Sequence, residues 1–409
     1  MSSIQTDILI IGAGPAGTIA AAVLLKKGYR VLIVEKNKFP RFVIGESLLP
    51  HCMNLLEEAG LLEAVQNFGF QKKRGADFHF RGKKSTVEFG EQFSNGWKFT
   101  YQVKRAEFDQ LLANKAVENG AKILFEHEVV SATPEFNNCS VVIRDKQQQT
   151  TTVTSRYILD SSGNAAVLGS LLQLNEPSIL TPKIALYSHQ KVDFKNTPFN
   201  KEKISVVIHP TQAQCWYWII PFQDDIVSVG FTTNDDHVAS QTGNENQKYL
   251  SILKEVPEIS SWIHDDQFLF PAIKSAGYSR RIKTFFGSGF AIAGNAGEFL
   301  DPIFSSGVTI ALKSGINAAG LIHRELSGEK INWQTEYVNL LLKGIRVFEA
   351  FVQAWYNEDL IKIFFNPNQP TPIRIRISSI LAGYAWDESN QLTQYTERRI
   401  KSLADSCSL

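Results

Sequence analysis

Three glycines near the start of the chain, Gly12, Gly14 and Gly17, have the spacing G-x-G-x-x-G, and Glu35 follows about 20 residues later. Glycine at these positions permits a tight turn, close approach of a pyrophosphate to the backbone, and close packing of a helix on a strand. A carboxylate at the end of the next strand can accept hydrogen bonds from the hydroxyls of an unphosphorylated ribose. These residues therefore predict a dinucleotide-binding site.

The elements that must position these residues follow in the required order. Residues 8–11 are an apolar strand, an alanine-rich helical stretch runs to about Lys27, and residues 30–34 form a second strand that ends on Glu35. The start of that helix directs unpaired N–H groups and a partial positive charge towards the phosphates. Because FAD and NAD both carry an unphosphorylated ribose, this unit leaves the choice between them open.

The bulk composition excludes some partners. The chain has 409 residues and a formal net charge of +1, from 42 basic and 41 acidic side chains, so we expect no nucleic-acid partner. No basic segment followed by an apolar stretch of signal length is seen near Met1, and no apolar run reaches about 18 residues, so we expect a cytoplasmic protein without membrane contact. The four cysteines are Cys52, Cys139, Cys215 and Cys407. They lie too far apart in the sequence for a metal-binding cluster, and we expect neither disulfides nor a bound metal.

Three segments together favour FAD. The N-terminal pattern, Y-I-L-D-S-S-G (157–163) and A-G-N-A-G-E-F-L-D-P (293–302) resemble, in this order, the FAD-contacting motifs of flavoproteins related to para-hydroxybenzoate hydroxylase. This resemblance implies a flavin-contacting role for Arg105 and a backbone contact from Val129 to the adenine. The alternative for Arg105 is a helix cap or a surface cation.

The turn and the resemblance together give a set of expected FAD contacts. One of them departs from the family, because Asn295 stands where aspartate is usual, and the loss of charge assistance predicts weaker binding of FAD. The full set is Gly12, Gly14, Pro15, Ala16, Gly17, Glu35, Lys36, Arg41, Ser47, Arg105, Val129, Asp160, Gly163, Gly294, Asn295, Gly307 and Val308.

Four further segments are similar to the flavin-dependent halogenases: F-P-R-F-V-I-G-E-S-L-L-P (39–50), W-Y-W-I-I-P (216–221), D-P-I-F-S-S-G-V (301–308) and S-I-L-A-G-Y-A-W-D (379–387). Trp216 and Trp218 alternate on a predicted strand and share a face. The resemblance implies that they form a wall between the flavin and a second chamber, although two such indoles could also simply fill a core. Cys215 replaces the glycine that leads this signature.

A helical stretch begins near Gly307, so the N–H groups of residues 306–308 should be unpaired and suited to an anion. In a flavoprotein this anion would be the N1–C2=O edge of reduced flavin, and the halogenase resemblance adds a nearby chloride. An ordinary helix start after a turn is the alternative.

Lys73, in F-Q-K-K-R-G-A-D-F (70–78), occupies the position of the halogenase lysine, which implies that it holds the oxidised halogen against the substrate. A second interpretation is a solvated basic cluster, because Lys72 and Arg74 flank it. Phe304 stands where tryptophan halogenases carry glutamate, so the resemblance disfavours free tryptophan. It implies a small aromatic (phenolic or pyrrolic) or amphipathic substrate, either free or carrier-bound.

We therefore expect an FAD-dependent oxidoreductase resembling two-component halogenases, which use reduced FAD, O2 and chloride or bromide. No second G-x-G-x-x-G unit is present for a nicotinamide, so a separate flavin reductase is expected. The alternatives are an aromatic hydroxylase, a flavoprotein similar to geranylgeranyl reductases, and a non-catalytic flavin-binding protein.

The predicted fold class is α/β, with a Rossmann-like FAD/NAD(P)-binding domain, an inserted antiparallel β-sheet substrate domain and a helical C-terminal region. Strands are expected from Lys183 to about Phe231, with a hairpin at residues 223–225. Phe348, Phe351 and Trp355 lie on one helical stripe and should be core. The expected boundaries are 1–180, with a substrate-side segment near 70–105, then 181–285, 286–330 and 331–409.

Overall fold

The computed structural model describes residues 2–178, 180–212, 214–277 and 279–407. Its first layer is a six-stranded sheet in which five strands are parallel and one edge strand is antiparallel. The strand order is β20 (Phe286–Gly287), β21 (Phe290–Ile292), β12 (Tyr157–Asp160), β2 (Ile8–Ile11), β3 (Val31–Glu35) and β8 (Lys122–Phe125). The mixed α/β architecture and the first βαβ unit predicted from the sequence are confirmed.

Two helices pack tightly beside this sheet. Helix α1 (Pro15–Lys26) follows the glycine turn, and α9 (Ser306–Leu326) lies against it. Gly315 permits this approach, because a Cβ there would lie 2.5 Å from the carbonyl oxygen of Ala16. Helix α9 begins at Ser306, one residue before the predicted start. Because α9 packs on α1, its position is fixed relative to the glycine turn that precedes α1.

The second large sheet has seven strands in the order β18 (Ile273–Ala276), β14 (Ile184–Lys191), β17 (Ile226–Thr233), β16 (Trp216–Pro221), β15 (Lys203–Ile208), β5 (Gly75–Phe80) and β6 (Lys83–Glu88). The strands predicted between Lys183 and Phe231 are present, and β16 and β17 form the predicted hairpin. Strand β5 joins this sheet parallel to β15, so the first hundred residues contribute to it.

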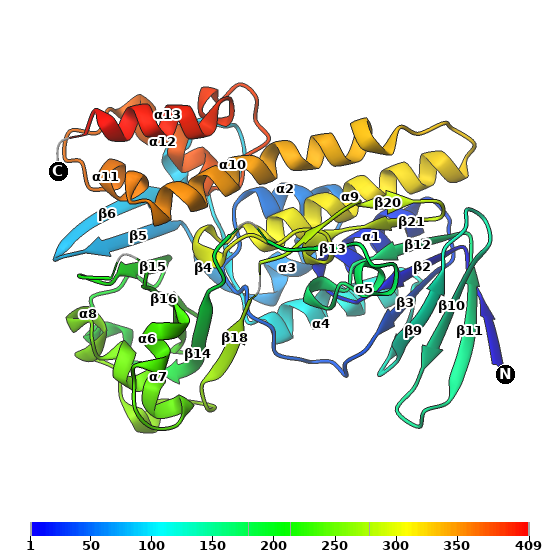
Figure 1. Ribbon diagram of the computed structural model, residues 1–409, viewed down its shortest axis with the longest axis horizontal. Helices are drawn as coiled ribbons and strands as arrows, with labels where there is room; N and C mark the ends of the chain where they lie inside the picture. The colour runs from blue at the N-terminus through cyan, green and yellow to red at the C-terminus, as the bar shows by residue number, and fades with distance from the viewer. Residues whose placement is uncertain (1, 179, 213, 278, 408–409) are drawn as a thin grey trace.

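The two faces of this sheet have different neighbours. Trp216 and Trp218 pack with the main core that includes the six-stranded sheet, while Tyr217 and Ile219 belong to a separate cluster on the opposite face. That outer face is covered by α6 (Asp235–Ala239), α7 (Glu245–Leu253) and α8 (Pro257–Ser260), at the lower left of Figure 1. The period-2 prediction for the tryptophans is confirmed.

The C-terminal region is helical, as predicted, and consists of α10 (Asn339–Tyr356), α11 (Asp359–Phe364), α12 (Thr371–Leu381) and α13 (Thr396–Asp405). These helices lie above β5 and β6 in Figure 1. The stripe of Phe348, Phe351 and Trp355 is fully buried, and Trp355 packs on Phe78 of β5 with the ring centroids 5.7 Å apart. The stripe is therefore core, as the periodicity indicated.

The remaining elements are smaller. A four-stranded sheet contains β1 (Ser2–Gln5), β11 (Thr150–Ser155), β10 (Cys139–Arg144) and β9 (Glu128–Thr133), and two short ladders join β4 (Gln71–Lys73) to β7 (Thr100–Gln102) and β13 (Asn175–Glu176) to β19 (Arg281–Ile282). The other helices are α2 (His51–Glu58), α3 (Leu62–Phe68), α4 (Arg105–Glu118) and α5 (Val167–Leu171). Within the described ranges, no helix is both long enough and apolar enough to cross a membrane.

Candidate functional site

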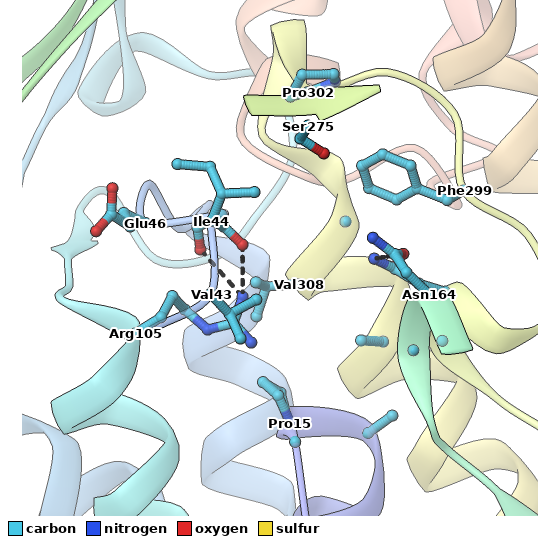
Figure 2. Close-up of a pocket in the computed structure, with 18 of the residues that line it drawn as sticks. Pro15, Val43, Ile44, Glu46, Arg105, Asn164, Ser275, Phe299, Pro302 and Val308 are labelled. Carbon is cyan, nitrogen blue, oxygen red and sulfur yellow. Dashed lines mark hydrogen bonds between the residues drawn. The ribbon is translucent and has the colours of Figure 1, made fainter. Parts of the chain in front are cut away.

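A cavity of about 430 Å³ lies between the glycine turn, the start of α9 and the tryptophan-bearing face of the seven-stranded sheet. Figure 2 shows the 43–47 segment and Arg105 on one side of Val308, with Asn164 and Phe299 on the other. Trp216, Trp218 and Ile220 supply an apolar wall from β16. The cavity thus joins residues from distant parts of the sequence.

The glycine turn has the geometry that its spacing predicted. Gly12 has φ +99°, and a Cβ there would lie 2.6 Å from the carbonyl oxygen of Ser161. A Cβ on Gly17 would lie 2.1 Å from the carbonyl oxygen of Gly12, so helix and turn touch there. Gly14 differs, because a Cβ on it would meet only the Arg41 guanidinium, 3.6 Å away. Gly14 therefore leaves open space at the cavity floor, where a phosphate would approach.

Glu35 lines the cavity at the end of β3 and is bound to the turn itself. Its Oε2 accepts a hydrogen bond of 2.9 Å from the Ala13 N–H, and its Oε1 accepts one of 2.9 Å from the Asn37 N–H. Arg41 lies 3.9 Å from Glu35 and forms an ion pair of 2.9 Å with Asp109. A carboxylate and a guanidinium are thus held side by side next to Gly14.

Arg105 is buried at 8% exposure and is not a surface cation. Its guanidinium binds both carboxylate oxygens of Asp109, at 2.8 and 2.9 Å, and donates to the carbonyl oxygens of Ile44 and Gly45 at 3.2 and 3.4 Å. The dashed lines in Figure 2 mark the bonds to these carbonyls. Arg105 therefore fixes the backbone of the 43–47 segment, which forms one side of the cavity.

The start of α9 also lines the cavity. Ser305 precedes it with φ 56°, and among the described residues no side chain caps this helix. Gly307 and Val308 line the cavity, as do Gly294 and Asn295, whose amide donates to Asn164 Oδ1 at 3.4 Å. Uncapped N–H groups at the start of a 21-residue helix favour negative charge.

Lys73 is the largest surprise of the site. Lys72 and Arg74 are exposed, as a solvated cluster requires, but Lys73 between them is 1% exposed. Its Nζ donates to Ser47 Oγ at 2.7 Å and to the Leu48 carbonyl oxygen at 2.9 Å, and burial lowers the pKa of Lys73 to about 7. Because Ser47 lines the cavity, Lys73 lies directly behind the lining.

Several predicted FAD contacts line the cavity and others do not. The lining residues include Gly12, Gly14, Pro15, Ala16, Glu35, Arg41, Ser47, Arg105, Gly163, Gly294, Asn295, Gly307 and Val308. Gly17, Lys36, Lys73, Val129 and Asp160 are absent from the lining found in the described part of the chain.

The residues outside the lining have identifiable structural contacts. Lys36 has an exposed ion pair of 2.7 Å with Glu128, and Val129 is buried in β9. Burial raises the pKa of Asp160, and its carboxylate accepts hydrogen bonds from the N–H groups of Ser162 at 2.9 Å and Leu168 at 2.7 Å. Asp160 therefore shapes the turn at residues 161–165, which does line the cavity.

Sequence reasoning missed a buried pair beside this site. Glu46 is 1% exposed, and its Oε1 lies 2.7 Å from His189 Nε2 on β14. In Figure 2 the carboxylate of Glu46 points away from Val308. Its bond to His189 joins the 43–47 segment to β14 of the seven-stranded sheet. No local sequence pattern links two residues so far apart in the chain. Glu46 could have been suspected only because it lies in segment 39–50, which resembles the flavin-dependent halogenases.

The polar groups around the cavity match those of FAD. Ser161 Oγ is buried and has no hydrogen-bond partner among the described residues, so a ligand hydroxyl or phosphate could use it. The open space at Gly14 and the uncapped start of α9 suit a pyrophosphate and an electron-rich ring edge, respectively. The residues present therefore fit FAD.

Comparison with known proteins agrees with this geometry. The family model described as FAD binding domain matches residues 5–270. The chain belongs to this FAD-binding family. It is an FAD-dependent oxidoreductase related to the flavin-dependent halogenases, and the predicted family and cofactor are confirmed.

Two curated relatives of this FAD enzyme are halogenases, and each aligns with it over nearly the whole length of both chains. The 1H-pyrrole-2-carbonyl-[peptidyl-carrier protein] brominase of Pseudoalteromonas luteoviolacea is 32% identical over 391 residues, covering 93% of this chain and 92% of the relative. The corresponding chlorinase of Pseudomonas fluorescens is 28% identical over 407 residues, covering 94% and 90%.

Solved structures extend the comparison. A flavoprotein/dehydrogenase from Cytophaga hutchinsonii has a TM-score of 0.94 and 38% identity, with 98% of each chain covered. The flavin-dependent brominase Bmp2 has a TM-score of 0.85 and 25% identity, with 98% of this chain and 100% of the brominase covered. The FAD enzyme therefore shares its whole architecture with both.

Proposed function

We propose that this enzyme is a two-component flavin-dependent halogenase that acts on a phenolic or pyrrolic substrate. It would receive reduced FAD from a separate reductase and use chloride or bromide with O2. The observation that carries this proposal is the buried Lys73, which is bound to the cavity-lining Ser47 at 2.7 Å. A solvated lysine at this position would not support it.

The cavity residues have separable roles in this proposal. When bound and reduced, FAD supplies the oxygen activation that oxidises the halide. The first N–H groups of α9, at Gly307 and Val308, stabilise negative charge at that end of the cavity. Trp216 and Trp218 form an apolar wall that separates the substrate from the cavity and excludes water.

Lys73 would act on the oxidised halogen. Burial lowers the pKa of Lys73 to about 7, so near neutral pH about half of the molecules carry this side chain as the free amine. A free amine is a better partner for an electrophilic halogen than a solvated ammonium. In this proposal Lys73 Nζ holds the halogen where Ser47 lines the cavity, and Ser47 Oγ orients the amine.

Two observations support the substrate class. Phe304 is 4% exposed and packs edge-on against Phe351 and Trp355, with centroids 6.0 and 5.9 Å apart, so no carboxylate is available there for an amino-acid substrate. The two pyrrole halogenases named above act on carrier-bound pyrrole, which favours a carrier-bound substrate for this chain.

One observation favours a second candidate. The Cytophaga protein, at 38% identity, is described as a flavoprotein/dehydrogenase rather than a halogenase. A halide-independent oxidoreductase on the same scaffold would bind FAD in the same cavity and leave Lys73 as a structural cation.

Mass spectrometry of products separates the two candidates. Wild-type enzyme is incubated with reduced FAD, O2 and bromide or chloride, with free phenols, free pyrroles and carrier-bound pyrrole-2-carbonyl as substrates. We expect a halogen-shifted product, lost by about 100-fold or more in Lys73→Ala and retained within about twofold in the exposed neighbour variant Lys72→Ala. Oxidised product without halogen would favour the second candidate, and halogenation that persists in Lys73→Ala would remove Lys73 from the mechanism.

A further inference from the structure

A chain of hydrogen bonds links the tryptophan wall to the C-terminal helices. The indole Nε1 of Trp216 donates to the hydroxyl of Tyr356 at 3.1 Å, and that hydroxyl donates to Asp301 Oδ2 at 2.9 Å. Trp216 is 2% and Asp301 4% exposed and Tyr356 is half-buried, so these bonds are partly shielded from water. The three residues come from β16, from the end of α10 and from the loop before α9.

Asp301 extends this chain to the segment before α9. Its second oxygen, Oδ1, accepts a hydrogen bond of 3.0 Å from the N–H of Ile303 and so caps the short 3-10 helix Pro302–Phe304. That short helix leads directly into Ser305 and the first turn of α9. The hydrogen-bonded chain therefore runs from the apolar wall at Trp216 to the segment that leads into α9, and both line the cavity.

Tyr356 is itself held in place from two directions. Its carbonyl oxygen accepts a hydrogen bond of 3.0 Å from the Gln214 side chain, and the Lys183 ammonium lies 4.7 Å from the centre of its ring. Lys183 in turn donates to Gln214 at 2.5 Å and to Asn234 at 2.6 Å. These contacts hold the Tyr356 side chain in one position, so its hydroxyl stays between Trp216 and Asp301.

We propose that Tyr356 is a positioning residue for the cofactor: by bonding Trp216 and Asp301 together, it sets the separation between the tryptophan wall and the start of α9. This inference rests on the placement of FAD in the cavity between them, and not on halogenation. Tyr356 is absent from the lining among the described residues, so it acts through Trp216 and Asp301.

Loss of the hydroxyl should be felt at the cavity. In Tyr356→Phe the aromatic ring remains, but the Trp216 N–H and Asp301 Oδ2 lose their shared partner. A buried polar group without a partner drives local rearrangement, and here that rearrangement changes the width of the cavity. We expect affinity for oxidised FAD to fall about tenfold, together with a changed visible spectrum of the bound flavin.

A double-mutant cycle tests the route of this effect. Dissociation constants for oxidised FAD are measured by titration for wild type, Tyr356→Phe, Trp216→Phe and the double variant. If Tyr356 acts through the Trp216 N–H, each single variant weakens binding about tenfold and the double variant is little worse than either single one. Trp216→Phe, which removes the indole N–H, also tests the same bond should Tyr356→Phe fail to fold.

Tyr217→Phe is the matched control. Tyr217 precedes Trp218 on the same strand, and its buried hydroxyl donates to the Ile252 carbonyl oxygen at 3.0 Å on the opposite face. We expect FAD affinity within about twofold of wild type in this variant. Independent effects that multiply to about a hundredfold, or an equal loss in Tyr217→Phe, would overturn the inference alone. Failure of wild type to bind FAD would overturn the cofactor placement and the inference with it.

Discussion

The two faces of the seven-stranded sheet have different polar neighbours. On the outer face, the Glu255 carboxylate is shared by His209 at 3.1 Å and His237 at 3.0 Å, and also accepts from Gln241 at 3.1 Å. On the cavity side, Ser161 Oγ is buried and has no partner among the described residues. Glu255 thus has its partners within the chain, whereas Ser161, which follows β12 of the six-stranded sheet, leaves a polar atom for a ligand.

Neighbouring side chains of β16 point to opposite faces of the sheet, so residues that stabilise the fold alternate along this strand with residues that line the cavity. Alternate residues of β16 serve either a closed core or a ligand cavity, although they are neighbours in sequence. Substitutions on the outer face should therefore affect unfolding most, and substitutions on the cavity face should affect FAD most.

The largest expected effect is the loss of stability caused by Tyr217→Ala. Tyr217→Ala removes a fully buried ring on the outer face and should lower the free energy of unfolding by about 3–5 kcal/mol. Trp218→Ala removes a larger ring, but one that borders an existing cavity, so we expect about 1–3 kcal/mol together with weakened FAD binding. Urea denaturation without FAD measures the first quantity and FAD titration the second. Equal losses of stability in the two variants would show that the faces are not separable.

Lys73 supplies a pH-dependent test on the cavity side. Burial lowers the pKa of Lys73 from 10.5 to about 7, so between these values the unfolded chain binds a proton that the folded chain does not. The free energy of unfolding should therefore rise with pH from about 7 towards 10.5, by up to about 1.4 kcal/mol per pH unit. This contribution should be absent in Lys73→Met. Denaturation at several pH values checks it, and parallel curves for the two proteins would contradict the burial of Lys73.

The smallest effect concerns Asn295, which lines the cavity. Asn295→Asp should tighten FAD binding about fivefold, because a charge-assisted hydrogen bond to a ligand hydroxyl gains about 1 kcal/mol over a neutral one. Titration with FAD measures the gain, and unfolding without FAD should change much less. Unchanged or weaker binding would show that Asn295 does not contact a hydroxyl of the ligand.

Local features of the site could be predicted from sequence because neighbouring residues determine them. The turn at Gly12 requires a positive φ, and the strand at Trp216 and Trp218 places alternate side chains on one face. Both predictions depend only on residues a few positions apart. The start of α9 was placed within one residue for the same reason.

Tertiary contacts could not be predicted in this way. Lys73 lies between two exposed basic residues, and its burial depends on Ser47 and Leu48, about 25 positions earlier. The bond between Glu46 and His189 joins residues 143 positions apart. Lys73 was suspected only from a resemblance, and the Glu46 pair was missed, because neither contact leaves a periodic pattern in the sequence.

The central claim is that FAD occupies the cavity between the start of α9 and the tryptophan wall. A crystal structure of the enzyme with FAD tests it most directly. We predict electron density for the flavin ring between Gly307 and Trp218, with the pyrophosphate beside Gly14. Density for the ring elsewhere, or side chains filling this cavity while FAD is bound at another site, would contradict the account.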